Sequence, residues 1–127
     1  MKKLLPLIFI FFLLACQNTS TTSEQGNGIF EKISKENFVK KMEEKTSKII
    51  LDVRTPEEFE KGTIEGAINI NFYDKNFDEQ LSNLDKSKPT FIFCKSGGRS
   101  GKTFNKMKTM EFTEVYELKG GYSAWKK

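Results

Sequence analysis

The chain has 127 residues, a formal net charge of +4 from 21 basic and 17 acidic side chains, two cysteines and no histidine. That length suits one domain of ordinary size, and 30% charged with 13% aromatic residues is typical of a chain that buries a core. The missing histidine excludes Ser-His and Cys-His nucleophile pairs and His-ligated zinc, and two cysteines are too few for a Cys-rich metal site or a disulfide framework. We therefore expect no metal and no cofactor, and any chemistry has to use a thiol, carboxylates, basic side chains and backbone dipoles.

The first sixteen residues have the pattern of an export signal. Lys2 and Lys3 precede an unbroken apolar run at residues 4–14, which is shorter than the roughly 18–20 residues that span a membrane and has the length of a signal-peptide core. The run ends in LLAC at residues 13–16, which resembles the lipobox of bacterial lipoproteins, where the signal is cut before an acylated cysteine. We predict a signal peptide at residues 1–15 and a lipid on Cys16. The alternatives are an ordinary signal peptide with an incidental cysteine, or a short buried helix.

The predicted lipidated cysteine begins a flexible linker at residues 16–28, because QNTSTTSEQGNG at residues 17–28 has no large apolar side chain to bury. Loss of Lys2 and Lys3 with the signal reduces the net charge to +2, which gives no reason to expect nucleic-acid binding. The lipid would anchor the domain to the cell envelope, on the periplasmic side of a bacterial membrane. Gln17 is not the Asp that usually retains lipoproteins in the inner membrane, so the outer membrane is favoured in a cell with two membranes.

From residue 29 onward, short apolar runs alternate with helical spacing. The runs at residues 49–51, 91–93 and 115–116 predict buried strands, and residues 29–33 and 68–70 are weaker candidates. Apolar residues at helical spacing predict helices after Ser34, at residues 77–84 and after Ser100. Thr55, Pro56 and Glu58 form a capping-box signature, and we interpret its carboxylates as structural. This order predicts an α/β fold, a three-layer domain over residues 29–127 with helices on both faces of a sheet.

Chemistry concentrates in one loop, CKSGGRS at residues 94–100. Cys94 follows a predicted strand, at the edge where open α/β sheets bind ligands. Gly97 and Gly98 allow successive N–H groups to turn inward as an anion-binding nest, the following helix adds partial positive charge, and Lys95 and Arg99 add full charges. Such surroundings lower a thiol pKa to about 3.5–7.5, so the loop predicts a reactive thiolate. The alternative is a buried, inert cysteine.

Four segments in order resemble the rhodanese family of sulfurtransferases. They are LDVRTPEEF at residues 51–59, GTIEGAINI at residues 62–70, the loop at residues 94–100, and VYELKGG at residues 115–121 with Trp125. The resemblance covers nearly all of residues 29–127. It implies a rhodanese-like domain with a five-stranded, mainly parallel sheet between helices, and transfer of a sulfane sulfur through a persulfide on Cys94.

Three residues depart from the family pattern. Thr63 and Glu65 stand where His and Pro are usual, and loss of the imidazole is expected to weaken one contact of that segment. Glu111 stands before Phe112, where many relatives have a helix-ending glycine, and a positive φ there would cost about 1 kcal/mol. We interpret all three as changes in stability and not in mechanism.

The length of the loop favours sulfur transfer over phosphate chemistry. Four residues separate Cys94 from Arg99, whereas phosphatases with a cysteine nucleophile have five, and a phosphate needs more space and more N–H donors than one terminal sulfur. A phosphatase or an arsenate reductase is therefore the least supported alternative. A second alternative is a non-catalytic rhodanese module that carries sulfur or binds a partner.

The expected mechanism starts with attack of the Cys94 thiolate on the outer sulfur of a small anionic donor, thiosulfate or a related persulfide. Arg99 is the second predicted catalytic residue and orients the departing anion, with electrostatic help from Lys95. The N–H groups from Lys95 to Ser100 hold the persulfide. No second cysteine of the domain can resolve the persulfide, so the acceptor is cyanide, an external thiol or a protein, and we expect the chain to be a monomer. The predicted binding residues are Lys95, Ser96, Gly97, Gly98 and Ser100.

Overall fold

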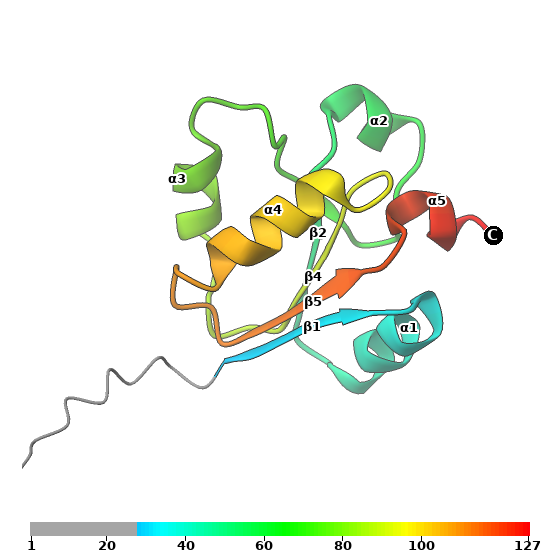
Figure 1. Cartoon of the computed structure of the whole chain (residues 1–127), viewed down its shortest axis with the longest axis horizontal. Coiled ribbons are helices and arrows are strands. Elements are labelled where there is room, and N and C mark those ends of the chain that lie inside the picture. Colours follow the sequence, from blue (N-terminus) through cyan, green and yellow to red (C-terminus); the bar gives the residue numbers. More distant parts are fainter. Residues whose placement is uncertain (1–27) are drawn as a thin grey trace, which may run out of the picture.

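The computed structural model describes residues 28–127, so the predicted signal peptide, the lipidation site at Cys16 and most of the linker lie outside the described residues. One sheet contains five strands in the order β1-β5-β4-β2-β3 (Figure 1), and every neighbouring pair is parallel. No helix in the described part of the chain is long and apolar enough to cross a membrane. The strands are β1 (Ile29–Ile33), β2 (Ile49–Asp52), β3 (Ile68–Asn69), β4 (Thr90–Phe93) and β5 (Glu114–Leu118).

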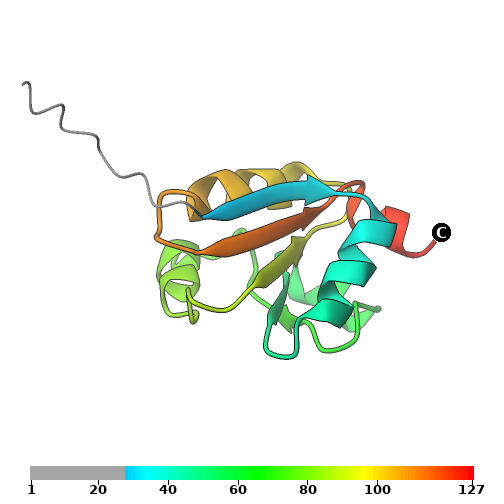
Figure 2. The ribbon, with the colours of Figure 1, turned by 90° about the horizontal axis from the view of Figure 1, so that it is seen from below.

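Helices cover both faces of the sheet. Side chains of α1 (Lys35–Glu44) and α5 (Gly121–Trp125) pack on one face, and those of α3 (Phe77–Ser82) and α4 (Gly98–Met107) pack on the other. Figure 2 shows α4 and α1 on opposite sides of the strands. The short helix α2 (Pro56–Glu60) follows β2. The predicted three-layer α/β fold is confirmed, and the sheet is entirely parallel.

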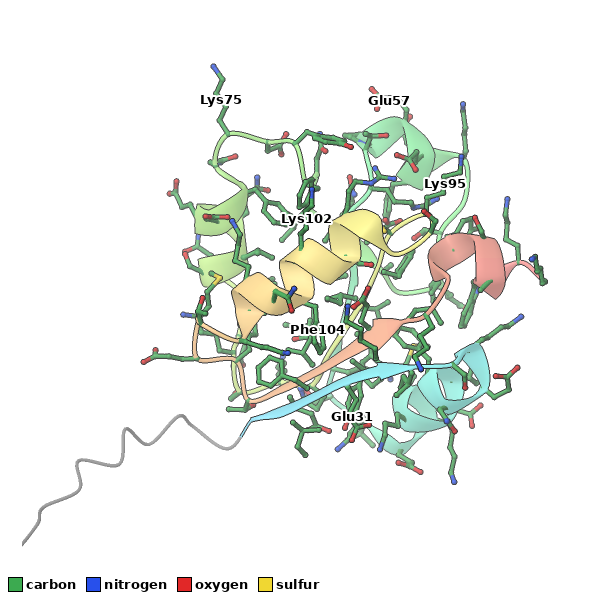
Figure 3. All side chains as sticks on the ribbon, in the orientation of Figure 1. Glu31, Glu57, Lys75, Lys95, Lys102 and Phe104 are labelled. Carbon is green, nitrogen blue, oxygen red and sulfur yellow. The ribbon has the colours of Figure 1, made fainter. Side chains whose placement is uncertain are left out.

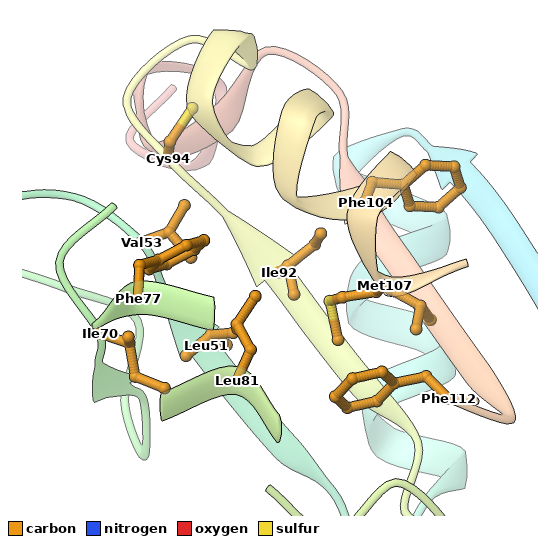
Figure 4. Packing of buried hydrophobic residues seen from close by; sticks show 11 residues of the cluster. Leu51, Val53, Ile70, Phe77, Leu81, Ile92, Cys94, Phe104, Met107 and Phe112 are labelled. Atoms are coloured by element: carbon orange, nitrogen blue, oxygen red, sulfur yellow. The ribbon is translucent and has the colours of Figure 1, made fainter. Parts of the chain in front are cut away.

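The alternation of side chains along β4 determines which face the loop cysteine joins. Phe91 and Phe93 belong to the apolar cluster beneath α1, whereas Ile92 and Cys94 belong to the cluster beneath α3 and α4. All four residues of β4 are buried, as expected for a central strand covered on both faces. Figure 4 shows Cys94 at the end of β4, with its sulfur directed toward the first turn of α4. Cys94 therefore continues the core pattern of the strand into the loop.

Local capping signals place the starts of α1 and α2 where the sequence predicts them. The Ser34 hydroxyl accepts from the Asn37 N–H at 3.4 Å, and Thr55 and Glu58 form the reciprocal capping box of α2. Two boundaries differ from expectation. The helix α3 ends at Ser82, so Leu84 follows it and still packs against the core, and α4 begins at Gly98, which puts Arg99 and Ser100 in its first turn.

Glu111 is the only non-glycine residue with a positive φ in the described chain, at 66°. It is exposed in the turn between α4 and β5, and nothing in that turn requires its side chain. Because a Cβ atom is strained in this conformation, we expect Glu111→Gly to raise the free energy of unfolding by about 0.5–1 kcal/mol. Urea unfolding of the two proteins measures this difference. Lys108→Gly, in the same connection with an ordinary φ of −58°, should destabilise, and a Glu111→Gly variant that does likewise contradicts the prediction.

Candidate active site

The candidate site lies at the carboxyl edge of the sheet, where the chain leaves β4 and enters α4 (Figure 1). Gly97 has a φ of 113° and caps α4, a conformation that L side chains rarely adopt. Its N–H thereby turns back toward the start of the loop and donates to Cys94 Sγ at 3.1 Å. Of the two glycines predicted to form the anion-binding nest, Gly97 is the one whose N–H contacts the sulfur.

Cys94 is only 1% exposed, and its sulfur lies among hydrogen-bond donors. The Ser100 hydroxyl donates to Sγ at 3.3 Å, in addition to the Gly97 N–H. Burial by itself raises the pKa of the Cys94 thiol, but the Ser100 hydroxyl and the N–H groups of Ser100, Gly97 and Ser96 outweigh it and hold the pKa below its ordinary value. The loop therefore favours the thiolate without an imidazole.

Arg99 extends from the loop to α2. Both Nη atoms of its guanidinium donate to the Glu58 carboxylate, at 2.7 and 3.0 Å, and the guanidinium lies 5.8 Å from the centre of the Tyr73 ring. From the sequence, Arg99 is expected to orient the departing anion, and Glu58 is expected only to cap a helix. In the structure the Glu58 carboxylate both caps α2 and binds Arg99, because Glu58 Oε1 also accepts from the Thr55 N–H at 3.4 Å. Residues 41 positions apart give no sequence signal of such a pair.

The Arg99 guanidinium lowers the pKa of Glu58 to about 2, below its ordinary 4.5. A lowered carboxyl pKa stabilises the folded protein above the unfolded pKa, and this stabilisation is lost as the pH falls from about 4.5 to about 2. We expect Glu58→Gln to lower the free energy of unfolding at pH 7 by about 1–2 kcal/mol, since the pair is partly exposed, and to flatten its decline below pH 4.5. Denaturant unfolding at pH 7 and pH 3 measures both effects.

The matched control for this pair is Glu57→Gln. Glu57 lies one residue earlier in the first turn of α2, is exposed and points away from the loop (Figure 3). Equal losses at pH 7 in the two variants would attribute the effect to α2 itself and contradict a specific role of the pair with Arg99.

A buried network fixes the segment around Thr63. Arg54 Nε donates to Asp52 Oδ1 at 2.9 Å, and its Nη2 donates to Asp52 Oδ2 at 2.7 Å and to the Gly62 carbonyl at 2.6 Å. The Thr63 hydroxyl donates to Asp52 Oδ2 at 2.9 Å. The guanidinium also lies 4.3 Å from the centre of the Tyr122 ring in α5. Thr63 thus makes a contact at the place where loss of an imidazole was expected to weaken one.

The helix α5 supports the loop from behind. The Tyr122 N–H donates to the Cys94 carbonyl at 2.7 Å, and the Ser123 N–H donates to the Lys95 carbonyl at 3.0 Å. Gly121, with a φ of 59°, approaches so closely that a Cβ atom would lie 2.5 Å from the Cys94 carbonyl oxygen. The sequence pattern does not predict this helix. Its nearest signal was the glycine pair at residues 120–121.

A pocket of about 320 Å³ lies beside the loop and is mostly cationic. Lys95 reaches it from the loop, between α2 and α5 in Figure 3. Glu58, already paired with Arg99, is its one acidic side chain. Of the other predicted binding residues, Ser96 and Gly98 are exposed and Ser100 is fully buried. The cationic side chains of the pocket come from Arg54, Lys61, Lys95 and Lys126.

Comparisons with known proteins find matches to a family model, to sequences and to solved structures. The family model described as a rhodanese-like domain matches residues 34–127. Thiosulfate sulfurtransferase 16 of Arabidopsis thaliana, a chloroplastic protein, is 41% identical over 87 residues, which cover 61% of this chain and 72% of the relative. Thiosulfate sulfurtransferase GlpE of Shewanella oneidensis is 31% identical over 96 residues, 76% of this chain and 92% of the relative. The crystal structure of a rhodanese-like domain protein from Staphylococcus aureus has a TM-score of 0.65 at 27% identity, covering 76% and 91% of the two chains.

Proposed function

We propose that this chain, which belongs to the rhodanese-like domain family, moves a sulfane sulfur from thiosulfate or a persulfide donor to a thiol or cyanide through a persulfide on Cys94. The family and its thiosulfate sulfurtransferase members support sulfurtransferase-like chemistry. The observation that carries the proposal is the buried Cys94 sulfur, which accepts hydrogen bonds from the Gly97 N–H and the Ser100 hydroxyl.

In the first half-reaction the Cys94 thiolate attacks the outer sulfur of thiosulfate. A new S–S bond forms at Cys94, the S–S bond of the donor breaks, and sulfite leaves with the electron pair. The terminal sulfur of the persulfide carries the negative charge, and the N–H groups that favour the thiolate stabilise it. The neighbouring cationic pocket supports an anionic donor, because side chains such as Lys95 attract it.

In the second half-reaction the acceptor attacks the terminal sulfur. Cyanide leaves as thiocyanate, or a thiol leaves as a persulfide, and Cys94 returns to the thiolate. Arg99 is held on Glu58 by two hydrogen bonds. In this proposal Arg99 therefore acts on the leaving anion through a positive charge held in a fixed position, and its side chain does not move to bind the anion.

The experiment is intact-mass measurement of the purified chain before and after thiosulfate, followed by addition of cyanide. A gain of one sulfur atom that disappears as thiocyanate forms supports the proposal. Stable loading with no turnover favours the sulfur-carrying or partner-binding module, and an unmodified thiol with every donor contradicts sulfur transfer. Hydrolysis of an aryl phosphate would support the phosphatase alternative, which no observation at the site favours.

We also propose that the protein is attached to the cell envelope by a lipid. The lipobox-like residues 13–16 support a lipid on Cys16 and attachment to the periplasmic side of a bacterial membrane, with the outer membrane favoured where there are two. These residues lie outside the described part of the chain. Membrane fractionation of cells that express the full chain tests the attachment, and recovery of the protein in the soluble fraction contradicts it.

A further inference from the structure

One buried carboxylate beside the loop has no part in the steps above. Glu117 lies in β5 between β1 and β4 and is only 3% exposed. Its Oε1 lies 3.0 Å from the Ser100 hydroxyl oxygen, and a Cβ atom on Gly101 would lie 3.6 Å from the same Oε1. The carboxylate is therefore located directly beneath the first turn of α4, one side chain away from the reactive sulfur.

The charge on Glu117 is only partly compensated. Its Oε2 lies 3.2 Å from Lys32 Nζ, but this contact lacks hydrogen-bond geometry, and Oε2 accepts no hydrogen bond from any described residue. The Lys32 side chain is 46% exposed, so solvent screens its attraction to the carboxylate. A buried carboxylate without donors is costly, so the Ser100 hydroxyl is the hydrogen bond that Glu117 depends on.

Ser100 has one hydroxyl proton and two acceptors. Its oxygen lies 3.3 Å from Cys94 Sγ and 3.0 Å from Glu117 Oε1, and one proton cannot serve both at once. When Cys94 is a thiolate, the hydroxyl donates to the sulfur and Glu117 loses its donor. When Cys94 carries a persulfide, the charge has moved to the outer sulfur, and the hydroxyl is free to donate to Glu117.

We propose that Glu117 is a positioning residue that draws the Ser100 hydroxyl away from Cys94 whenever Sγ is uncharged, and so favours the sulfur-loaded protein over the free thiolate. This inference rests on the proposed sulfur transfer for the loaded state. No covalent bond is made or broken at Glu117. The only change is that the Ser100 hydroxyl donates to Glu117 instead of to Cys94. Lys32 of β1 is the cation next to Glu117, and Arg99 of α4 is the cation near Cys94.

The test is Glu117→Gln in the full chain. The glutamine side chain has no negative charge and can donate its amide N–H to Ser100, which leaves the hydroxyl for the sulfur. We expect the thiol pKa of Cys94 to fall by about one unit, the equivalent of one hydrogen bond to a charged group. Where the thiolate predominates, the loaded-to-free ratio at a fixed thiosulfate-to-sulfite ratio should fall by up to about tenfold. The pH dependence of alkylation gives the first quantity and intact mass the second, with Cys94→Ser as the blank for Cys16.

The controls separate this role from a structural one. Glu114→Gln removes another carboxylate of β5, one that pairs with Lys45 away from the loop, and should leave both quantities unchanged. In a Ser100→Ala background, Glu117→Gln should lose most of its effect, and Ser100→Thr should restore it. A thiol pKa that is unchanged in Glu117→Gln, or shifts equally without the hydroxyl, overturns the inference. If the wild-type chain takes up no sulfur but the pKa shift occurs, the proposed function fails and the control of the hydroxyl stands.

Discussion

Cys94→Ser is expected to take up no sulfur and to lose turnover from thiosulfate to cyanide by at least ~10³-fold. The serine oxygen occupies nearly the same volume and can still accept from the Gly97 N–H that now contacts the sulfur. It stays protonated at neutral pH, however, and cannot hold a sulfane sulfur. Thiocyanate formation and intact mass measure the two losses.

The control for this variant is Cys16→Ser, which removes the other cysteine of the chain and should leave sulfur uptake by the purified protein unchanged. Unfolding of Cys94→Ser in urea should match that of the wild type to within about 1 kcal/mol, because the substitution is nearly isosteric. Retained uptake in Cys94→Ser would move the reaction to another residue and end the proposed mechanism.

The second large effect is expected for Gly121→Ala. The new Cβ would lie 2.5 Å from the Cys94 carbonyl oxygen and 2.7 Å from the Lys95 carbonyl oxygen, at a φ of 59°. Backbone strain and overpacking together predict a loss of roughly 2–5 kcal/mol in the free energy of unfolding. Relief of the contact displaces Cys94, so activity should fall as well, even where the protein remains folded.

Denaturant unfolding together with the thiocyanate assay below the unfolding transition separates these two effects. Gly98→Ala is the matched stability control, because a Cβ there meets nothing within 4 Å and the residue opens a helix. A Gly121→Ala variant that is as stable as Gly98→Ala would show that α5 can retreat from the loop at no cost, against the close packing seen here.

Much of the framework is predictable because its causes are local. Buried runs such as residues 91–93 give strands, and caps at Ser34 and Thr55 give helix starts. The loop at residues 94–100 is equally predictable from the sequence, because its glycines and its position after a strand direct backbone N–H groups toward the Cys94 sulfur. These features require only a few neighbouring residues and the period of their apolar side chains.

The remaining features depend on contacts between distant segments. The carboxylate of Glu58 satisfies a capping box by itself, so its hydrogen bonds to Arg99 leave no trace in the local pattern. Glu117 stands between the buried residues Tyr116 and Leu118 of β5, and only the pairing of β5 with β1 and β4 shows that its carboxylate lies near the loop. The helix α5 is five residues long, too short for an apolar period to identify.

The parallel arrangement of all five strands has a consequence for how the protein faces its surroundings. Ile29 begins β1 at the amino edge of the sheet, whereas Cys94 follows β4 at the carboxyl edge, so roughly 15 Å of strand separate the start of β1 from the loop at residues 94–100. A lipid on Cys16 would be joined to the opposite, amino edge through the predicted flexible linker at residues 16–28, so the anchor would leave the loop free to face the aqueous compartment.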